Sequence, residues 1–288
     1  MLIWFGQNLR QASQAAMTVV HKIDEGTDRR EVTATTYQMR NFYRQFGDGF
    51  FSVLDIMNYI QHQTVVRMAK EEDRVLDMCC GRGLLLPMLR YERKGIESYT
   101  GVDIQASNAS YRKSRVTDNK PITKGYYPFK VYFVNHNVAS MSEILPKDYF
   151  TFIVYTSSIE HMQPSDGRQS LFEARSVAQK GCRLFLSCPN TPEDQDGYEA
   201  QYAAHVYEWK ASEIITTLKD SGWKLEDMYG LLIDGNVLKS KLKNPEHKRL
   251  QEAYLRQLQF IPREWLIPMY AALFPEDAKE LAFVATAI

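Results

Sequence analysis

Residues 74–89 read RVLDMCCGRGLLLPML, and this stretch decides the fold of the chain. Its first part is rich in strand-forming residues and contains a single acid near its end, Asp77. Two glycines, Gly81 and Gly83, follow, and the leucine-rich segment over 84–91 predicts a helix. Glycine adopts backbone conformations that other residues avoid and lets a ligand approach the main chain. The stretch therefore predicts a strand, a tight ligand-binding turn and a helix.

The spacing of the glycines excludes two common nucleotide-binding loops. The dinucleotide fingerprint G-x-G-x-x-G needs a third glycine where Leu86 stands, and the Gly-Lys-Ser/Thr of a P-loop is absent. Open α/β sheets bind their ligands outside the carboxyl ends of the strands, which is where this turn would lie. An acid that leads into the turn favours a cationic ligand, such as one with an amino group and a sulfonium.

Beyond this stretch, short β-rich runs alternate with helical patterns. Such alternation indicates βαβ units, an α/β fold with a mainly parallel sheet, and right-handed crossovers. The predicted strands lie at 74–79, 98–104, 129–137, 148–158, 181–188, 223–233 and 280–288, and the predicted intervening helices at 84–91, 107–116, 167–178 and 212–222.

Helical patterns also occur before the first strand and before the last one. From Tyr37 onward, apolar spacing predicts two helices, and a longer helical insertion follows the sixth strand. Its aromatic residues Trp265, Tyr270 and Phe274 are expected in a packed core rather than at the mouth of a site. The expected organisation is an N-terminal extension over 1–36 and one domain over 37–288, with the helical insertion at 235–280.

Composition narrows the compartment and the partners. The 288 residues are 44% hydrophobic, and Lys plus Arg equals Asp plus Glu, so the net charge is near zero. This balance argues against a protein that grips nucleic acid by its phosphates. The four cysteines lack the C-x-x-C spacing of a zinc site, and the first twenty residues match neither a signal peptide nor a membrane span. We expect a reduced, cytoplasmic protein with no membrane partner.

The segment VLDMCCGRG, residues 75–83, resembles the first motif of the class I S-adenosylmethionine-dependent methyltransferases, roughly V-L-D-x-G-x-G-x-G. Asp77, Gly81 and Gly83 match this motif, whereas Cys79 stands where the first glycine is usual. The resemblance implies a seven-stranded, mostly parallel, Rossmann-like sheet with helices on both faces. It also implies S-adenosyl-L-methionine as cofactor. The pattern is closest to the branch that methylates small molecules and quinones.

Two further motifs, in the family's order, imply the adenosine part of the cofactor site. The segment TGVDIQ resembles the second strand, whose terminal acid, here Asp103 followed by Ile104, would bind the ribose hydroxyls. In VNHNVASM, Asn137 would accept a hydrogen bond from the adenine amino group, and Val138 would pack on the ring. The alternatives are an ordinary strand-end acid at Asp103 and a loop-capping amide at Asn137.

The segment FTFIVYTSSIEHM resembles the family's fourth strand and the E-H turn that follows it. Thr156 and Ser157 would lie beside the methionine part of the cofactor. His161 is the predicted general base, because an imidazole titrates near neutrality. The alternative is that Glu160 and His161 only cap a helix or hold the loop.

A second histidine lies in a passage that resembles the family's H-x-x-x-W segment. His205 is predicted as a second base or a contact to the substrate, and Trp209 and Trp223 of the same passage are expected in the core. No metal site is expected.

These observations predict a methyltransferase that acts on an oxygen or nitrogen of a small-molecule substrate. A nucleic-acid methyltransferase is the alternative, but the (D/N/S)-P-P-(Y/F) motif of the DNA amino-methylating enzymes is missing after the fourth strand. The basic run KSKLKNPEHKR over 239–249 is the one feature that favours nucleic acid. A third reading, suggested by Cys79 and Asn137, is a non-catalytic binding protein. The aromatic residues of the insertion would suit a homodimer interface.

Overall fold

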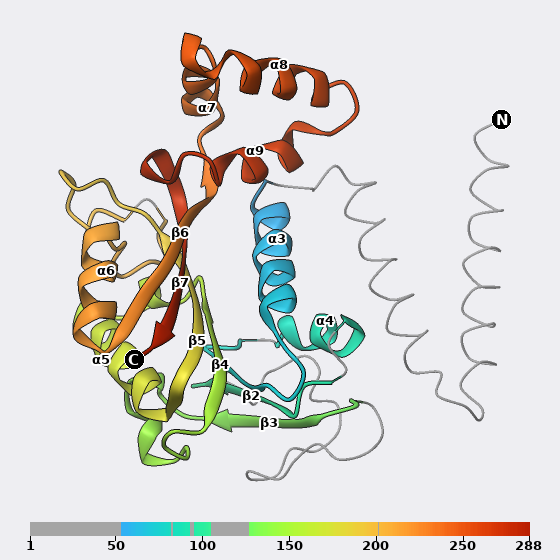
Figure 1. Cartoon of the computed structure of the whole chain (residues 1–288). Helices are drawn as coiled ribbons and strands as arrows, with labels where there is room; N and C mark the ends of the chain where they lie inside the picture. Colours follow the sequence, from blue (N-terminus) through green and yellow to red (C-terminus); the bar gives the residue numbers. More distant parts are fainter. Residues whose placement is uncertain (1–52, 82, 93–94, 105–126, 201) are drawn as a thin grey trace, which may run out of the picture. The chain divides into compact units, whose positions relative to one another are not determined.

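The computed structural model describes residues 53–81, 83–92, 95–104, 127–200 and 202–288. These residues form a seven-stranded sheet with the order β3-β2-β1-β4-β5-β7-β6 (Figure 1). The strands are β1 (Arg74–Met78), β2 (Ser98–Asp103), β3 (Lys130–Asn135), β4 (Phe150–Thr156), β5 (Ala178–Pro189), β6 (Trp223–Ile233) and β7 (Ala278–Ala287).

The sheet is mostly parallel, as predicted. Strands β1 to β5 pair in parallel, and β7 pairs antiparallel with both β5 and β6. The extension over 1–36, the first helix expected after Tyr37 and the helix predicted at 107–116 lie outside the described residues.

Helices cover both faces of the sheet. They are α3 (Val53–Met68), α4 (Leu85–Glu92), α5 (Pro164–Val177) and α6 (Ala211–Asp220), with the short 3₁₀ helices η2 (Val138–Glu143) and η3 (Ile159–His161) after β3 and β4. In β4, Phe152 and Val154 pack in one apolar cluster with α3 and α4, whereas Ile153 and Tyr155 pack in another with α5 and α6. Because both faces are buried, the strand reads as a continuous apolar run rather than as an alternation.

The register of the parallel strands brings several polar residues to one edge of the sheet. Asp77 pairs with Gly101 near the end of β1, and Asp103 pairs with Asn135 at the end of β2. Thr156 ends the neighbouring strand β4. The acids that the sequence singled out therefore lie at the carboxyl edge of the sheet, where α/β proteins bind their ligands.

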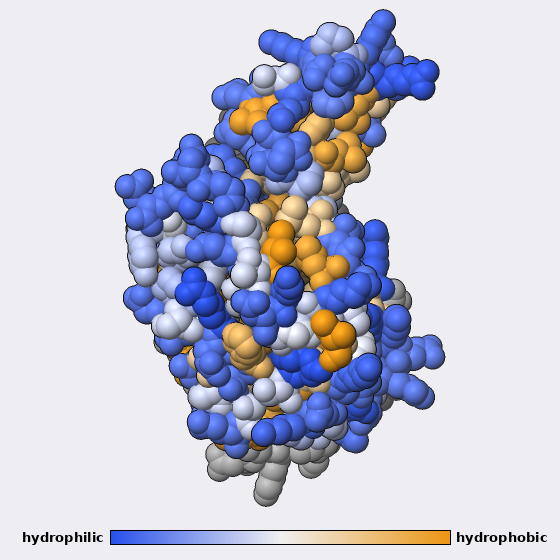
Figure 2. Space-filling model, turned by 60° about the vertical axis from the view of Figure 1, so that its left-hand side comes forward, coloured by the Kyte–Doolittle hydropathy of each residue, from blue (hydrophilic) through white to orange (hydrophobic). Residues whose placement is uncertain are grey.

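The predicted insertion forms helices with an apolar cluster of their own. They are α7 (Gly235–Leu242), η4 (Pro245–His247), α8 (Lys248–Gln257), α9 (Arg263–Ala271) and η5 (Pro275–Asp277). Tyr270 and Phe274 are buried in this cluster, which confirms the expected core packing for these two aromatics, whereas Trp265 is half-buried. Tyr270 and Phe274 are therefore not available to the suggested dimer interface. Figure 2 shows apolar surface on the upper part of the view. Two large apolar side chains of the insertion, Phe260 and Met269, are exposed. No described helix has the length and apolar character needed to cross a bilayer.

The contact between β6 and α9 depends on a glycine. A Cβ atom at Gly230 would lie 2.3 Å from the carbonyl oxygen of Ala271 and 2.8 Å from the Cβ of Ala278. Because one of these atoms belongs to the backbone, α9 must shift to admit a methyl group. We expect Gly230→Ala to lower the free energy of unfolding by about 1–3 kcal/mol, as measured by urea denaturation. A change below about 0.5 kcal/mol would show that α9 is not packed rigidly on β6.

Candidate functional site

The turn after β1 has the tight geometry that the sequence predicted. Cys79, Gly81 and Gly83 all have positive φ angles, of 54°, 50° and 71°. The Cys80 N–H donates to the Val102 carbonyl oxygen at 3.1 Å, which ties the turn to β2. Cys79 thus adopts the left-handed conformation that a glycine takes freely and that costs another residue about 1–2 kcal/mol.

Asp77 is buried at the end of β1. The residue is only 5% exposed, and its Oδ2 accepts a hydrogen bond from the Tyr99 hydroxyl at 2.5 Å. Burial raises the pKa of Asp77 to about 7, and the nearby Asp103 raises it as well, whereas the Tyr99 hydrogen bond lowers it. The carboxyl group is therefore poised to ionise when a cation arrives beside it.

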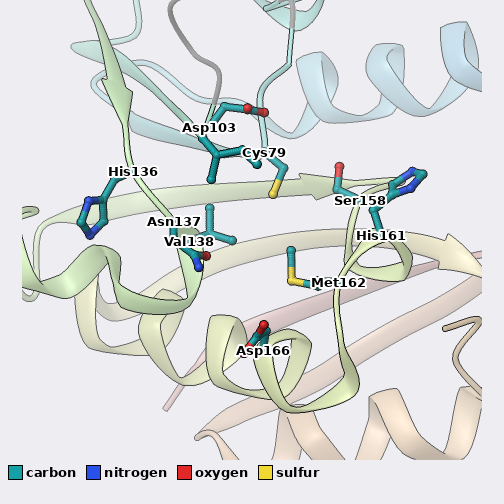
Figure 3. A pocket seen from close by; sticks show the side chains of 10 residues that line it. Cys79, Asp103, His136, Asn137, Val138, Ser158, His161, Met162 and Asp166 are labelled. Atoms are coloured by element: carbon teal, nitrogen blue, oxygen red, sulfur yellow. The ribbon is translucent and has the colours of Figure 1, made fainter. Parts of the chain in front are cut away.

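A cavity of about 360 Å³ opens next to this turn (Figure 3). Asp103, Ile104, Asn137, Val138 and His161 are among the residues that line it. Asp103 is held toward the turn because its Oδ2 accepts from the Gly81 N–H at 3.0 Å. Ile104 is 73% exposed and lines the cavity, so its side chain offers an apolar surface to a ligand there.

The side chain of Asn137 caps a helix. Its Oδ1 accepts from the Ala139 N–H at 2.9 Å and so caps η2, which is the alternative that the sequence left open. An amide oxygen has two lone pairs and its nitrogen two hydrogens, so capping leaves the side chain able to bond a ligand. The role of Asn137 toward a cofactor stays a prediction.

A second cavity, of about 460 Å³, adjoins the first. Cys79 and Ser158 line both cavities. The second one is lined from the β1 side by Asp77, Cys80 and Gly81, from the end of β4 by Thr156 and Ser157, and from α3 by Asp55, Asn58, Tyr59, Gln61 and His62. Burial lowers the pKa of His62 to about 4, so this imidazole is neutral at physiological pH.

A buried network of polar side chains fixes the floor of the second cavity. Ser157 has a positive φ of 44°, and its hydroxyl donates to Glu280 Oε1 at 3.2 Å. The Ser187 hydroxyl donates to Gln61 Oε1 at 2.8 Å and so connects β5 to α3. Burial and the neighbouring Glu160 hold the pKa of Glu280 well above its ordinary value. The network thus positions α3 against the carboxyl edge of the sheet.

The two cavities fit the cofactor that the sequence resemblance implies. S-adenosylmethionine carries an ammonium group, a sulfonium, a ribose diol and an adenine. Asp77 and Asp103 supply negative charge, and Ile104 and Val138 supply apolar surface. Among the described residues that line either cavity, none is a lysine or arginine. The lining therefore suits a cation and offers no lysine or arginine to a phosphate. A Cβ at Gly81 would meet no atom within 4 Å, so the turn leaves open space for a ligand.

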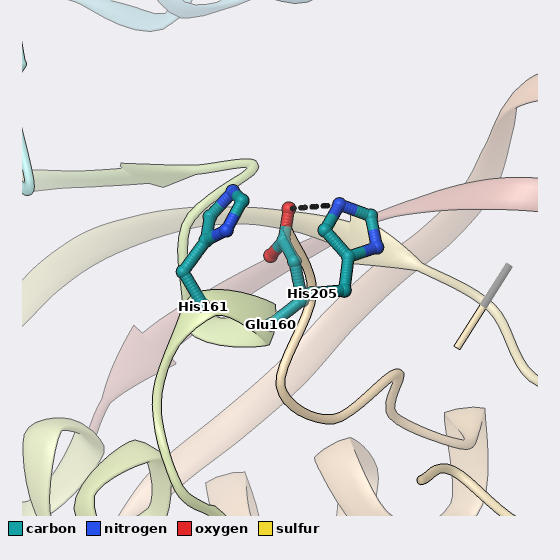
Figure 4. Close-up of side chains that lie close together, drawn as sticks. All are labelled: Glu160, His161 and His205. Atoms are coloured by element: carbon teal, nitrogen blue, oxygen red, sulfur yellow. Dashed lines mark ion pairs between the residues drawn. The ribbon is translucent and has the colours of Figure 1, made fainter. Parts of the chain in front are cut away.

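Three side chains meet beside the first cavity, as Figure 4 shows: Glu160, His161 and His205. Glu160 is 1% exposed, and burial raises its pKa to about 8. The backbone carbonyl of Glu160 accepts from the Val206 N–H at 2.7 Å and from the Tyr207 N–H at 3.1 Å. These bonds bring the segment with His205 against η3.

Each predicted site residue can now be placed. All the predicted cofactor residues except Gly83, which is buried in the turn, line one of the two cavities: Asp77, Cys79, Gly81, Asp103, Ile104, Asn137, Val138, Thr156 and Ser157. Of the predicted bases, His161 lines the first cavity and His205 lines neither. Trp209 and Trp223 are buried in the core, as expected.

No sequence motif pointed to Glu208 or to the cavity-lining residues of α3, among them Gln61. Glu208 lies three residues after His205 and hydrogen-bonds to it, a spacing that could have drawn notice. The polar residues of α3 read as an ordinary solvated helix face, because their place beside the cavity depends on how α3 packs.

Comparison with known proteins supports the fold and the family. A family model described as "Methyltransferase domain" matches residues 56–227. A methyltransferase from Haloferax volcanii, solved in complex with the Trm112 methyltransferase activator, has 15% identity and a TM-score of 0.51, and the match covers 86% of this chain and 95% of that one. A SAM-dependent methyltransferase from Archaeoglobus fulgidus has 18% identity and a TM-score of 0.50, over 85% of this chain and 99% of that one.

One curated relative adds a different function. The "Probable mRNA-capping enzyme" of Acanthamoeba polyphaga mimivirus is 23% identical over 284 residues, a match that covers 87% of this chain. The chain spans only 21% of the length of that viral protein.

Proposed function

This chain belongs to the methyltransferase domain family, and we propose that it methylates an oxygen or nitrogen atom of a small-molecule acceptor. It is an enzyme, and S-adenosylmethionine is its methyl donor. The observation that carries the small-molecule proposal is the size and lining of the two adjoining cavities, about 360 and 460 Å³, whose described lining residues include no lysine or arginine to hold a nucleic-acid backbone. Such volumes are typical of small-molecule sites.

The proposed donor site divides between the two cavities. Asp77 would hold the ammonium group, and Asp103 would accept hydrogen bonds from the ribose hydroxyls. Ile104 and Val138 would flank the adenine. Bound S-adenosylmethionine supplies an electrophilic methyl group, which passes in line to a lone pair of the acceptor.

The α3 face of the second cavity is the proposed acceptor site. Asn58, Tyr59 and His62 offer an amide, a hydroxyl and a neutral imidazole, which together donate and accept hydrogen bonds without adding positive charge. These groups suit a polar, neutral or cationic acceptor. His161 lines the first cavity, and its exposed imidazole could take a proton from an acceptor hydroxyl.

Cytoplasmic location is proposed on one observation. All four cysteines are free, and three of them are buried, which fits a reducing compartment.

A second candidate function is methylation of RNA. It is favoured by the similarity to the viral mRNA-capping enzyme and by the basic run over 239–249, where Lys239, Lys243, Lys248 and Arg249 are exposed. Incubation with labelled S-adenosylmethionine and a cell extract separated into RNA, protein and small-molecule fractions distinguishes the two. Label that depends on the added protein and resides in a small molecule other than S-adenosylmethionine supports the main proposal, and protein-dependent label confined to RNA supports the alternative.

The cofactor assignment is tested by calorimetry with S-adenosylmethionine. We expect Asp103→Ala to weaken binding about 10- to 100-fold, because hydrogen bonds to a charged group are worth about 1.5–3 kcal/mol. Asp220→Ala, which removes an exposed acid at the end of α6, is the matched control and is expected to bind as the wild type does. Equal binding by Asp103→Ala and wild type would exclude Asp103 from the ribose site.

A further inference from the structure

The cluster of Glu160, His161 and His205 has the composition of a metal site. Each residue offers one ligand atom, and these atoms all lie within 4.8 Å of one another. Glu160 and His161 come from η3, whereas His205 comes from the segment before α6. Figure 4 shows the three side chains converging.

Both imidazoles are oriented by an acceptor on one ring nitrogen. His161 Nδ1 lies 2.8 Å from the Ala204 carbonyl oxygen, and His205 Nδ1 lies 2.6 Å from Glu208 Oε1. A carbonyl or carboxylate oxygen only accepts, so Nδ1 carries the hydrogen and Nε2 carries the lone pair. Histidines that bind metals are held in this way, by a carbonyl or carboxylate on the ring nitrogen that does not bind the ion.

The carboxyl group of Glu160 provides independent support. Its Oε2 is buried and has no hydrogen-bond partner among the described residues, although Glu160 is only 1% exposed. Its Oε1 lies 4.0 Å from His205 Nε2, beyond hydrogen-bond distance. A buried polar atom without a partner is costly, and its presence needs an explanation such as an absent ion.

We propose that Glu160, His161 and His205 bind one divalent transition-metal ion, with Zn²⁺ as the representative case. Two imidazoles and a carboxylate suit zinc and its first-row neighbours better than magnesium or calcium, which prefer oxygen ligands. Metal–ligand bonds of about 2.0–2.2 Å require the three side chains to draw together by small rotations. Three protein ligands leave a coordination position open, as in catalytic zinc sites.

The role of the ion rests on the proposed function. His161 lines the first cavity and Ser158, three residues before it, lines both cavities, so an acceptor at the open position would lie close to the proposed donor site. A hydroxyl acceptor bound there loses its proton to solvent water more readily, because the ion stabilises the oxyanion. Its lone pair then forms the oxygen–carbon bond as the carbon–sulfur bond breaks, and the sulfur keeps that electron pair as a neutral thioether. His161 and His205 are then ligands rather than bases.

Metal binding is tested on the full chain without donor or acceptor. Protein stripped with a chelator is titrated with Zn²⁺, and the bound metal is measured by elemental analysis after desalting. Co²⁺ serves as a second probe, because its visible absorption reports the ligand set. One ion per chain is expected. If neither Zn²⁺ nor Co²⁺ binds at one ion per chain, the proposal is overturned.

Variants locate the ion. Glu160→Gln keeps the shape of the side chain, and we expect it to weaken Zn²⁺ binding by about 100-fold or more, whereas Glu208→Gln should weaken it about 10- to 100-fold. His161→Gln changes an exposed side chain, so this variant is expected to fold normally and to lose Zn²⁺ binding. It therefore tests the site even where Glu160→Gln is unstable. His247→Gln alters a half-buried histidine outside the cluster, and binding should not change.

Unchanged affinity in both Glu160→Gln and His161→Gln would overturn the proposed site. Because metal content is measured without methyl transfer, this result leaves the proposed function standing. Conversely, an ion bound as expected by a chain that methylates nothing would support the site and count against the proposed function.

Discussion

At pH 8, Asp77→Asn is expected to bind S-adenosylmethionine about 100-fold more weakly than the wild type. Asp77 is buried beside the second cavity, where its carboxylate would face the ammonium group of the donor. Removing one partner of a buried charge pair costs 2–5 kcal/mol, which corresponds to a factor of about 30 or more. Asparagine keeps the shape and can still accept the Tyr99 hydrogen bond, so the loss reports the charge.

The same residue makes cofactor binding depend on pH. The pKa of Asp77 is raised from 3.8 to about 7, so the carboxyl group of the free enzyme is largely protonated below pH 7. A cationic ligand binds the ionised form, and its affinity should fall about tenfold for each pH unit below 7. Asp77→Asn should abolish this dependence. Tyr99→Phe removes a hydrogen bond that lowers this pKa and should move the midpoint to higher pH.

The same pKa shift affects the stability of the free protein in the opposite direction: affinity for the cofactor rises with pH, whereas the contribution of Asp77 to stability falls. A carboxyl group whose pKa is higher in the folded than in the unfolded state holds more protons when folded between about pH 4 and 7. Stability therefore decreases as pH rises through this window, and Asp77→Asn should weaken that decrease. Calorimetry at pH 6 and 8, with urea denaturation at the same values, measures both effects. Equal cofactor affinity of the variant and the wild type at pH 8 would exclude Asp77 as the partner of the ammonium group.

The second large effect is expected at Asp73, far from the cavities. Arg183 donates to both carboxylate oxygens of Asp73, at 2.7 and 2.6 Å, and the Thr151 hydroxyl donates to Oδ1 at 2.8 Å. Asp73 is 5% exposed and the Arg183 side chain 18% exposed. We expect Asp73→Ala to lower the free energy of unfolding by about 3–5 kcal/mol, because it leaves the guanidinium largely buried without its partner.

A double variant separates the charge pair from packing. Asp73→Leu combined with Arg183→Met replaces the pair with apolar side chains, and its loss of stability should be smaller than that of Asp73→Ala. Urea denaturation at neutral pH measures all three proteins. If Asp73→Ala loses less than about 1 kcal/mol, solvent reaches Arg183 more freely than its exposure suggests.

The turn after β1 shows how far the sequence predicts a site. The acid, the glycines and the leucine-rich helix are consecutive, so the turn could be predicted from RVLDMCCGRGLLLPML alone. The left-handed conformation of Cys79 does not follow from its residue type, and only its place at a glycine position of the methyltransferase motif is consistent with a positive φ. For Asn137, residue type allowed both capping and adenine binding, and only the position of the Ala139 N–H shows that the side chain caps η2.

The sequence by itself determined the α/β fold, the strand ends that carry Asp77 and Asp103, and the methyltransferase resemblance. These features depend on periodicity and on short motifs, which are local along the chain. Only the tertiary structure decided that α3 lines the second cavity, that Arg183 meets Asp73 across 110 residues, and that His205 meets Glu160. Such meetings depend on strand register and on the path of the connecting segments. The register and the path of these segments depend on many contacts between residues far apart in the chain, which a local sequence pattern does not predict.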